Sequence, residues 1–407
     1  MIKVNAIVGQ SGGPTAAINA TLAGVIKGAL KEESIETLYG MKNGIEGFLN
    51  EDFVNLSEIF EDEYKLDLLS KTPSAMLGSC RRKLKGEDEE GQTYEKIFEI
   101  LKKYNIRYFF YIGGNDSMDT VSKLSKYAEK IGYDLKVIGV PKTIDNDLVA
   151  TDHTPGYASA AKFVATVMKE LARDISVYSM KAVTIVEVMG RDAGWLTLAS
   201  ALPKLTGESA PDLIYLPECT FDFEKFINDI KEVQETKPAV LVAVSEGVRL
   251  SDGSYVAKGI NTASKDAFGH TQLSGTARVL EALVKEKIGC KVRSIELSLL
   301  QRCAGHILSK TDIDESLAIG ASAVSAALRG QSGVMMTFVR KNTEKYEIEI
   351  SSAEISKIAN AVKTVPTEYV DCMERDITKE GLDYIAPLVL GEVATEYECG
   401  MPKHFVL

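Results

Sequence analysis

Residues 3–13 read KVNAIVGQSGG, a short apolar run that ends in glycines, and an alanine-rich helix is expected to begin near Thr15. Similar β-branched runs alternate with amphipathic stretches along most of the chain, which is typical of a parallel sheet covered by helices. The sequence therefore predicts an α/β protein with mostly parallel sheets. We expect strands over residues 3–8, 107–112, 135–140, 183–188, 239–244 and 293–297.

Several of these strands end in glycine or in a cluster of polar residues. In open α/β sheets ligands bind at the carboxyl ends of the strands, so the clusters should converge on one crevice. The clusters are residues 9–13, 113–116, 141–147, 189–191 and 245–247.

Length and composition describe an ordinary globular protein. A chain of 407 residues, 45% hydrophobic and 26% charged, predicts two or three domains. The net charge of −11 argues against a nucleic-acid-binding function, although local basic residues and backbone N–H groups could still bind phosphates. The six cysteines form no C-x-x-C pair and predict reduced thiols in the cytoplasm. No apolar run reaches the roughly 18 residues of a membrane helix, and the first residues do not resemble a targeting peptide.

Two segments have weaker patterns. Residues 40–73 are acidic with little apolar periodicity, which predicts a functional loop or an insertion. Beyond residue 341, polar and apolar residues alternate over 346–350, and a helical pattern follows.

Residues 142–147, KTIDND, form the most informative cluster. Phosphoryl transfer to an alcohol needs a base near the hydroxyl, a cation at the leaving phosphate and often a carboxylate for a metal ion. This segment could supply all three, although a solvated loop could have the same composition. Gly12-Gly13, before the first helix, could likewise bind a phosphate or only form a tight turn.

The order of these segments resembles the phosphofructokinase family over about residues 1–330. Segments TIDND (143–147) and VEVMGR (186–191) are specific together, whereas the short glycine pairs are not. Further matching segments are residues 11–13, 77–81, 112–117, 245–247 and 301–302. The resemblance implies two α/β sandwich domains with the active site in the cleft between them. The expected boundaries are 1–147 for the donor domain, completed by part of 306–407, then 148–305 for the sugar-phosphate domain and 306–407 for C-terminal helices and an extension.

The same resemblance implies roles for residues at the reaction centre. Asp145 would be the general base toward the sugar 1-hydroxyl, with Thr143 and Asp147 positioning the reacting groups. Arg81 would bridge donor and product phosphates, and Arg191 would stabilise the transferred phosphoryl group, since arginine is a multi-donor phosphate ligand.

Two binding sites follow from the resemblance. The donor site would comprise Gly12, Gly13, Arg81, Asp116 and Lys142. The sugar-phosphate site would comprise Thr143, Ile144, Asp145, Met189, Gly190, Arg191, Glu246, Arg293, Leu299 and Arg302. Arg293 would come from a neighbouring subunit, which implies a homo-oligomer. Taken singly, Met189 could be packing, Glu246 a helix cap and Arg81 part of a solvated basic turn.

Two positions resemble the pyrophosphate-dependent branch of the family. ATP-dependent members carry glycine where this chain has Asp116 and Lys142. Asp116 would repel a nucleotide α-phosphate, and Lys142 would add a cation for the small pyrophosphate. The expected reaction is therefore transfer from pyrophosphate to fructose 6-phosphate, with Mg2+ as cofactor.

Three departures modify these expectations. Asn115 replaces an aspartate that many members use at the metal, so the Mg2+ contact would shift to Asp116 or run through water, with Asn115 as a neutral oxygen donor. Leu299 replaces a residue that often contacts phosphate, and Ala23 replaces one arginine of the bacterial effector site, where Lys27 keeps the other basic position.

Three alternatives stay open at this stage. The chain could be an ATP-dependent 6-phosphofructokinase, or it could act on another ketose phosphate such as sedoheptulose 7-phosphate. A catalytically dead regulatory subunit is disfavoured because Asp145, Thr143, Asp147, Arg81 and Arg191 are all present.

Overall fold

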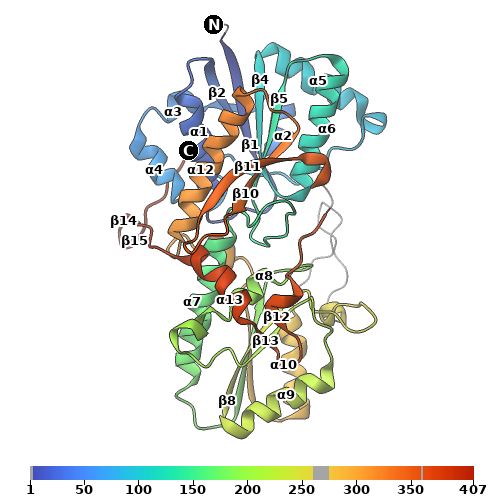
Figure 1. Cartoon of the computed structure of the whole chain (residues 1–407), viewed down its shortest axis with the longest axis vertical. Helices are drawn as coiled ribbons and strands as arrows, with labels where there is room; N and C mark the ends of the chain where they lie inside the picture. Colours follow the sequence, from blue (N-terminus) through green and yellow to red (C-terminus); the bar gives the residue numbers. More distant parts are fainter. Residues whose placement is uncertain (1–2, 260–274, 359–360) are drawn as a thin grey trace.

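A computed structural model of the chain describes residues 3–259, 275–358 and 361–407. The molecule has two parts, each built on its own sheet, and the larger part lies above the smaller one in Figure 1. The predicted α/β class, with mostly parallel sheets in two domains, is confirmed. The exact domain boundaries stay a prediction.

The first sheet has the order β11-β10-β5-β4-β1-β2-β3. Its end strands β11 and β3 run antiparallel to their neighbours, and the pairs between them are parallel. The strands are β1 (Val4–Gln10), β2 (Ile35–Met41), β3 (Phe53–Asn55), β4 (Ile106–Gly113), β5 (Lys136–Pro141), β10 (Val334–Arg340) and β11 (Ile348–Glu354).

Helices cover both faces of this sheet, because successive side chains of a strand point to opposite faces. In β4, Phe109 and Tyr111 pack with α5 and α6, whereas Phe110 and Ile112 pack with α1 and α12. A strand buried on both faces is apolar at nearly every position, which is why the short apolar runs predicted these strands. The helices are α1 (Ile18–Leu30), α5 (Glu87–Lys103), α6 (Asn115–Ile131) and α12 (Lys310–Leu328).

Helices α1 and α12 lie side by side (Figure 1) and approach backbone to backbone. A Cβ atom on Gly24 would collide with the carbonyl oxygen of Leu317, and one on Gly320 would collide with the carbonyl oxygen of Thr21. The C-terminal part of the chain is thereby joined tightly to the helix that follows the Gly12-Gly13 turn.

The second sheet has the order β7-β8-β6-β9 and is parallel throughout. Val186 and Val188 of β6 pack with α7 and α8, and Val183 and Ile185 pack with α9 and α10. The elements are β6 (Ala182–Val188), β7 (Leu213–Tyr215), β8 (Ala239–Ser245), β9 (Lys291–Glu296), α7 (Tyr157–Ile175), α8 (Trp195–Ala199), α9 (Phe223–Thr236) and α10 (Thr276–Lys287).

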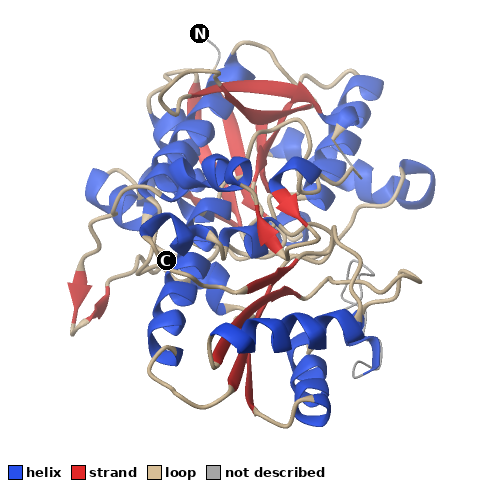
Figure 2. Cartoon of the chain, turned by 60° about the horizontal axis from the view of Figure 1, so that its bottom comes forward, coloured by secondary structure: helices blue, strands red, loops and turns tan. Residues whose placement is uncertain are grey.

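Short elements connect and cover the two parts (Figure 2). The short helices are α2 (Gly44–Leu49), α3 (Leu56–Ile59), α4 (Glu63–Ser70), α11 (Leu300–Cys303) and α13 (Lys379–Ile385), with 3-10 turns at Leu202–Thr206, Val256–Gly259, Ile355–Lys357, Thr367–Tyr369 and Ala386–Val389. The short strands are β12 (Val370–Asp371), β13 (Asp376–Ile377), β14 (Tyr397–Glu398) and β15 (Met401–Pro402).

The loop predicted over residues 40–73 is wrong. The segment folds into α2, β3, α3 and α4, and it buries Leu56, Phe60 and Leu69. Elements this short repeat their apolar face only once or twice, so they leave little periodicity in the sequence. The helical pattern expected after residue 350 is also wrong for the most part, because β11 continues to Glu354 and α13 is the only α-helix described beyond it.

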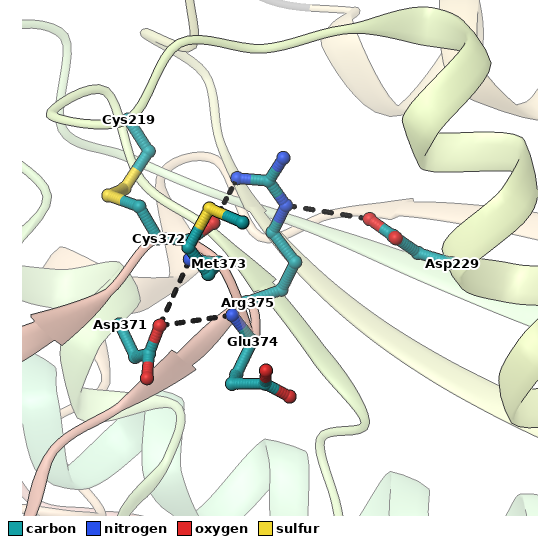
Figure 3. Close-up of a disulfide and its surroundings, with 7 residues drawn as sticks. All are labelled: Cys219, Asp229, Asp371, Cys372, Met373, Glu374 and Arg375. Atoms are coloured by element: carbon teal, nitrogen blue, oxygen red, sulfur yellow. Dashed lines mark hydrogen bonds and ion pairs between the residues drawn. A yellow bond between two sulfur atoms is a disulfide. The ribbon is translucent and has the colours of Figure 1, made fainter.

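Cys219 and Cys372 form a disulfide across a sequence separation of 153 residues (Figure 3). The expectation of six reduced thiols is therefore wrong for this pair. Cys372 lies in the turn between β12 and β13, where Asp371 accepts hydrogen bonds from the backbone N–H groups of Met373 and Glu374, each at 3.0 Å. Figure 3 also shows the Arg375 side chain directed toward Asp229 of α9, with which it forms a buried ion pair at 3.4 Å. This hairpin is thus fixed to the second part of the molecule.

Across the described parts of the chain, none of the helices combines the length and the apolar character that a membrane span requires.

Candidate active site

The loop after β5 carries the residues predicted at the reaction centre. The Thr143 hydroxyl accepts a hydrogen bond from the Asp145 N–H at 3.1 Å, and the Thr154 hydroxyl donates to the Thr143 carbonyl at 2.7 Å. Asn146 lies between the two aspartates in the left-handed region, with φ 52°, and is fully buried. Asp145 and Asp147 are therefore displayed on a tightly bonded turn at the carboxyl end of a strand.

Lys142 connects this loop with the Gly12-Gly13 turn after β1. Its side chain is buried, and Nζ donates a hydrogen bond to the Gly13 carbonyl at 2.6 Å. A Cβ on Gly12, whose φ is 76°, would lie 3.4 Å from Lys142 Nζ, and one on Gly13 would lie 3.0 Å from Arg302 Nη1. The two glycines thus leave room where two cationic side chains meet the backbone.

Burial lowers the pKa of Lys142 to about 8, although the carboxylate of Asp145 opposes this change. Arg302 lies close enough to lower the pKa of Lys142 further, and Arg81 and Arg302 repel each other. Several cations sharing one space favour a bound anion such as a phosphate.

The carboxyl groups have the opposite perturbation. Burial, and then the charge of Asp147, raises the pKa of Asp145 to about 7, while Arg191 and Lys142 oppose the rise. Burial, and then Asp145, raises the pKa of Glu246 to about 8. Titratable groups that are perturbed toward neutral pH and gather at the ends of strands are typical of a catalytic site.

The second sheet contributes the turn after β6. The Met189 N–H donates to Gln301 Oε1 at 3.2 Å, and the Gly190 N–H donates to Glu246 Oε1 at 3.3 Å. Gly190 has φ 134°, and the Ser245 hydroxyl donates to its carbonyl at 2.6 Å. Residues 189–191 are consequently held by the ends of β8 and by the segment that carries Arg302.

Asn115 and Asp116 begin α6, just after the end of β4. The Asn115 amide donates to the Ala361 carbonyl at 2.8 Å, and Asp116 forms an ion pair with Lys83 at 3.0 Å. Over the described residues, no group of three or more His, Cys, Asp or Glu side chains could hold a metal ion by itself.

Two predicted residues are exposed to solvent. Leu299 is 55% exposed immediately before α11, and Arg293 is exposed on the edge strand β9, opposite Thr184. The chain does not continue as a strand from Arg293 to Arg302, because β9 ends at Glu296 and a turn with a positive φ at Ser298 leads into α11.

Two residues of the C-terminal part contact this site but were not predicted from the sequence. Lys363 donates hydrogen bonds to the loop after β5, and the Tyr384 hydroxyl contacts the same loop. Neither residue follows a strand end or belongs to a motif, so no local signal in the sequence could have identified it.

Comparison with known proteins agrees with this geometry. The family model described as Phosphofructokinase matches residues 5–296. The pyrophosphate–fructose 6-phosphate 1-phosphotransferase of Methylococcus capsulatus is 40% identical over 100% of this chain and 96% of its own length. The sulfofructose kinase of Alkalicoccus urumqiensis is 32% identical over 97% of this chain and 98% of its own. The crystal structure of the pyrophosphate-dependent phosphofructokinase from Nitrosospira multiformis superposes with a TM-score of 0.88 and 37% identity, covering 99% of this chain and 96% of that chain.

Proposed function

Because the chain belongs to the phosphofructokinase family, we propose that it transfers a phosphoryl group from pyrophosphate to the 1-hydroxyl of fructose 6-phosphate. The products are fructose 1,6-bisphosphate and phosphate. The observation that carries the proposal is the buried Lys142, whose ammonium meets the Gly12-Gly13 turn on one side and lies near Asp145 on the other. A small, highly charged donor fits this position better than the middle of a nucleotide triphosphate.

The roles of the residues follow from their chemistry. Asp145 accepts the proton of the 1-hydroxyl, and its raised pKa suits a general base that works near neutral pH. Lys142 and Arg81 stabilise the leaving phosphate, and Arg191 stabilises the phosphoryl group in transit. The same groups serve the reverse direction, in which the protonated Asp145 returns its proton to the sugar oxygen.

Binding of the two substrates uses the remaining predicted residues. Thr143 and Asp147 orient the reacting groups. Gly12, Gly13 and Asp116 line the donor site, and the sugar phosphate is held by Ile144, Met189, Gly190, Glu246, Leu299 and Arg302, with Arg293 added from a second subunit of a homo-oligomer.

Mg2+ is the cofactor that fits these residues best. Mg2+ is usually held by one or two carboxylates together with substrate phosphates, and Asp116 with Asn115 offers that limited set of oxygen ligands. When bound, the ion would neutralise charge on the pyrophosphate oxygens.

Donor selectivity would depend on Asp116 and Lys142. The ion pair with Lys83 weakens the repulsion that Asp116 exerts on a nucleotide, so the space occupied by its side chain contributes alongside its charge.

Two alternatives keep the same chemistry. ATP could be the donor, or another ketose phosphate could be the acceptor, and one relative of this chain is named a sulfofructose kinase. We also place the enzyme in the cytoplasm, because charged sugar phosphates do not cross membranes unaided.

A donor comparison tests the proposal. The purified protein, assayed with fructose 6-phosphate and Mg2+, should have a much larger kcat/KM with pyrophosphate than with ATP. Lys142→Met should lower kcat with pyrophosphate by about 100-fold or more, because a cation at the leaving group acts mainly in the transition state. Lys136→Met, at the amino end of the same strand and paired only with Asp134 among the described acidic groups, is the control and should keep wild-type activity. Comparable turnover with ATP would show that the donor assignment is wrong.

A further inference from the structure

The turn that carries the two aspartates adopts a backbone conformation that needs support. Asn146, between Asp145 and Asp147, has φ 52°, in the left-handed region that few non-glycine residues adopt. Such a conformation persists only where the surrounding structure fixes it. The side chain of Asn146 is fully buried, so its hydrogen-bond partners decide how firmly the turn is held.

Those partners come from the C-terminal part of the chain. Lys363 Nζ lies 3.3 Å from Asn146 Oδ1, 3.1 Å from the Thr151 carbonyl and 2.7 Å from the Asp152 carbonyl. An ammonium group has three protons to donate, so these three acceptors saturate it. The Lys363 N–H also donates to the Asp147 carbonyl at 2.8 Å, which ties the backbone of one aspartate directly to this segment.

Tyr384 of α13 supports the turn from a second direction. Its hydroxyl donates to the Asp152 carbonyl at 2.6 Å and accepts a hydrogen bond from Asn146 Nδ2 at 3.4 Å. Lys363 and Tyr384 therefore use both polar atoms of the Asn146 side chain. Among the described hydrogen bonds, neither the Lys363 ammonium group nor the Tyr384 hydroxyl bonds to a residue that we assign to substrate binding.

The segment that carries Lys363 is itself anchored to the second part of the molecule. The Trp195 Nε1–H donates to the Lys363 carbonyl at 2.9 Å, and the Val365 N–H donates to Glu218 Oε1 at 2.9 Å. The neighbouring residue Cys219 forms the disulfide to Cys372 (Figure 3). Lys363 thus connects the turn after β5 with the part of the molecule that is expected to hold the sugar phosphate.

We propose that Lys363 and Tyr384 are positioning residues for phosphoryl transfer, which hold the left-handed turn at Asn146 and so keep Asp145 and Asp147 in register with the second domain. This inference rests on the proposed function for its kinetic consequences. It assigns a task to the C-terminal segment, which lies outside residues 5–296 matched by the family model.

Lys363→Met, which removes the charge and the three donors at nearly constant length, tests the inference. Because misplacement of a reacting group by about 1 Å can cost 100-fold, we expect kcat to fall about 10- to 100-fold while KM for both substrates changes less than about threefold. Lys357→Met is the control, since Lys357 is exposed and pairs only with Glu354 among the described acidic groups. Tyr384→Phe removes the hydroxyl but keeps the ring, and it decides the question alone if Lys363→Met does not fold.

The pH profile separates positioning from a simple loss of folded protein. Burial raises the pKa of Asp147, and the charge of Lys363 opposes this rise, so Lys363→Met should move the acid limb of kcat to higher pH. Tyr384→Phe removes no charge and should leave the limb in place while lowering kcat. Besides each other, Asp147 and Lys363 face further charged groups. Asp147 faces Asp145, Asp192 and Lys142, and Lys363 faces Asp152 and Arg340.

Hydrogen exchange gives a readout that needs no turnover. Amides of residues 143–152 should exchange faster in Lys363→Met and Tyr384→Phe than in the wild type, and Lys357→Met should leave them unchanged. If the wild type turns over pyrophosphate and both variants keep its kcat and its exchange pattern, the positioning role is wrong. If the wild type does not use pyrophosphate, the proposed function fails, and the exchange result still decides whether Lys363 and Tyr384 hold the turn.

Discussion

Asp145 shows how its position prepares a carboxylate for proton transfer. Burial and the neighbouring Asp147 raise its pKa to about 7, and the same burial lowers the pKa of Lys142 to about 8. A general base must be ionised, so kcat for making the bisphosphate should rise with pH through about 7. The lysine must be charged, so kcat should fall as the pH passes about 8. A profile of kcat against pH from 5 to 10 checks both limbs, and the acid limb reports the Asp145–Asp147 pair together.

Asp145→Asn keeps the shape of the side chain but removes the base. Loss of a general base typically costs about 100- to 10,000-fold, so kcat should fall by that factor and the acid limb should disappear. Binding of fructose 6-phosphate, measured by calorimetry, should survive because the residues expected to hold the sugar phosphate are intact. A variant that retained more than about a tenth of the wild-type kcat would show that another group takes the proton.

The residues at strand ends could be predicted from the sequence, whereas the residues that support them could not. Lys142, Asp145, Gly190 and Glu246 each follow a short apolar run, and parallel strands bring their carboxyl ends to one edge. Lys363 reaches Asn146 across 217 positions of sequence and lies in a segment with no regular pattern. Two of its three acceptors are backbone carbonyls, which every residue type carries, so the sequence does not indicate these contacts.

At the scale of elements, α1 and α12 determine how closely the C-terminal part packs on the first sheet. Gly320→Ala should destabilise the protein, because the new methyl group would collide with the backbone carbonyl of Thr21, which cannot move as a flexible side chain can. We expect a loss of about 2–3 kcal/mol, measured as a lower midpoint of thermal or denaturant unfolding.

Gly91→Ala in α5 is the matched control for this substitution. Gly91 follows a kink at Glu90, nothing lies within 4 Å of a Cβ placed on it, and its φ lies outside the left-handed region, so alanine fits there without strain. The control should therefore keep or raise the midpoint. Equal behaviour of the two variants would show that α1 and α12 can separate at little cost.

The elements also show where prediction from sequence reaches its limit. Long buried strands such as β4 and β8 were predicted within a residue or two, because each contains a nearly continuous run of aromatic, β-branched and other apolar residues that ends in glycine or a polar cluster. The elements between residues 40 and 73 were not predicted. A strand of three residues and helices of four to eight residues are stabilised mainly by tertiary packing, so their own sequence indicates them only weakly.

At the scale of the whole molecule, the two sheets present their strand ends to a common site, but one expected residue lies away from it. Arg293 is exposed on the edge strand β9 and lines a cavity together with Tyr178 and Met180. Met180 in this lining is 56% exposed, and Val177, which precedes Tyr178 in the sequence, is 75% exposed. Exposed apolar side chains that gather in one place are typical of a surface that contacts another protein. This environment supports the proposal that Arg293 serves the site of a second subunit.

Mixing two inactive variants tests that assignment. Asp145→Asn and Arg293→Ala should each be inactive alone, since one lacks the base and the other lacks the arginine supplied to its neighbour. In a mixed dimer with two-fold symmetry, one site carries both defects and the other carries neither, because each site combines Asp145 of one chain with Arg293 of the other. Equal mixing with full subunit exchange should therefore restore about a quarter of the wild-type activity.

Lys291→Ala, two residues earlier on the same face of β9, controls for damage to the contact and should stay active without mixing. A mixture that remains as inactive as its parents, despite subunit exchange shown by native mass spectrometry, would mean that Arg293 does not act across an interface.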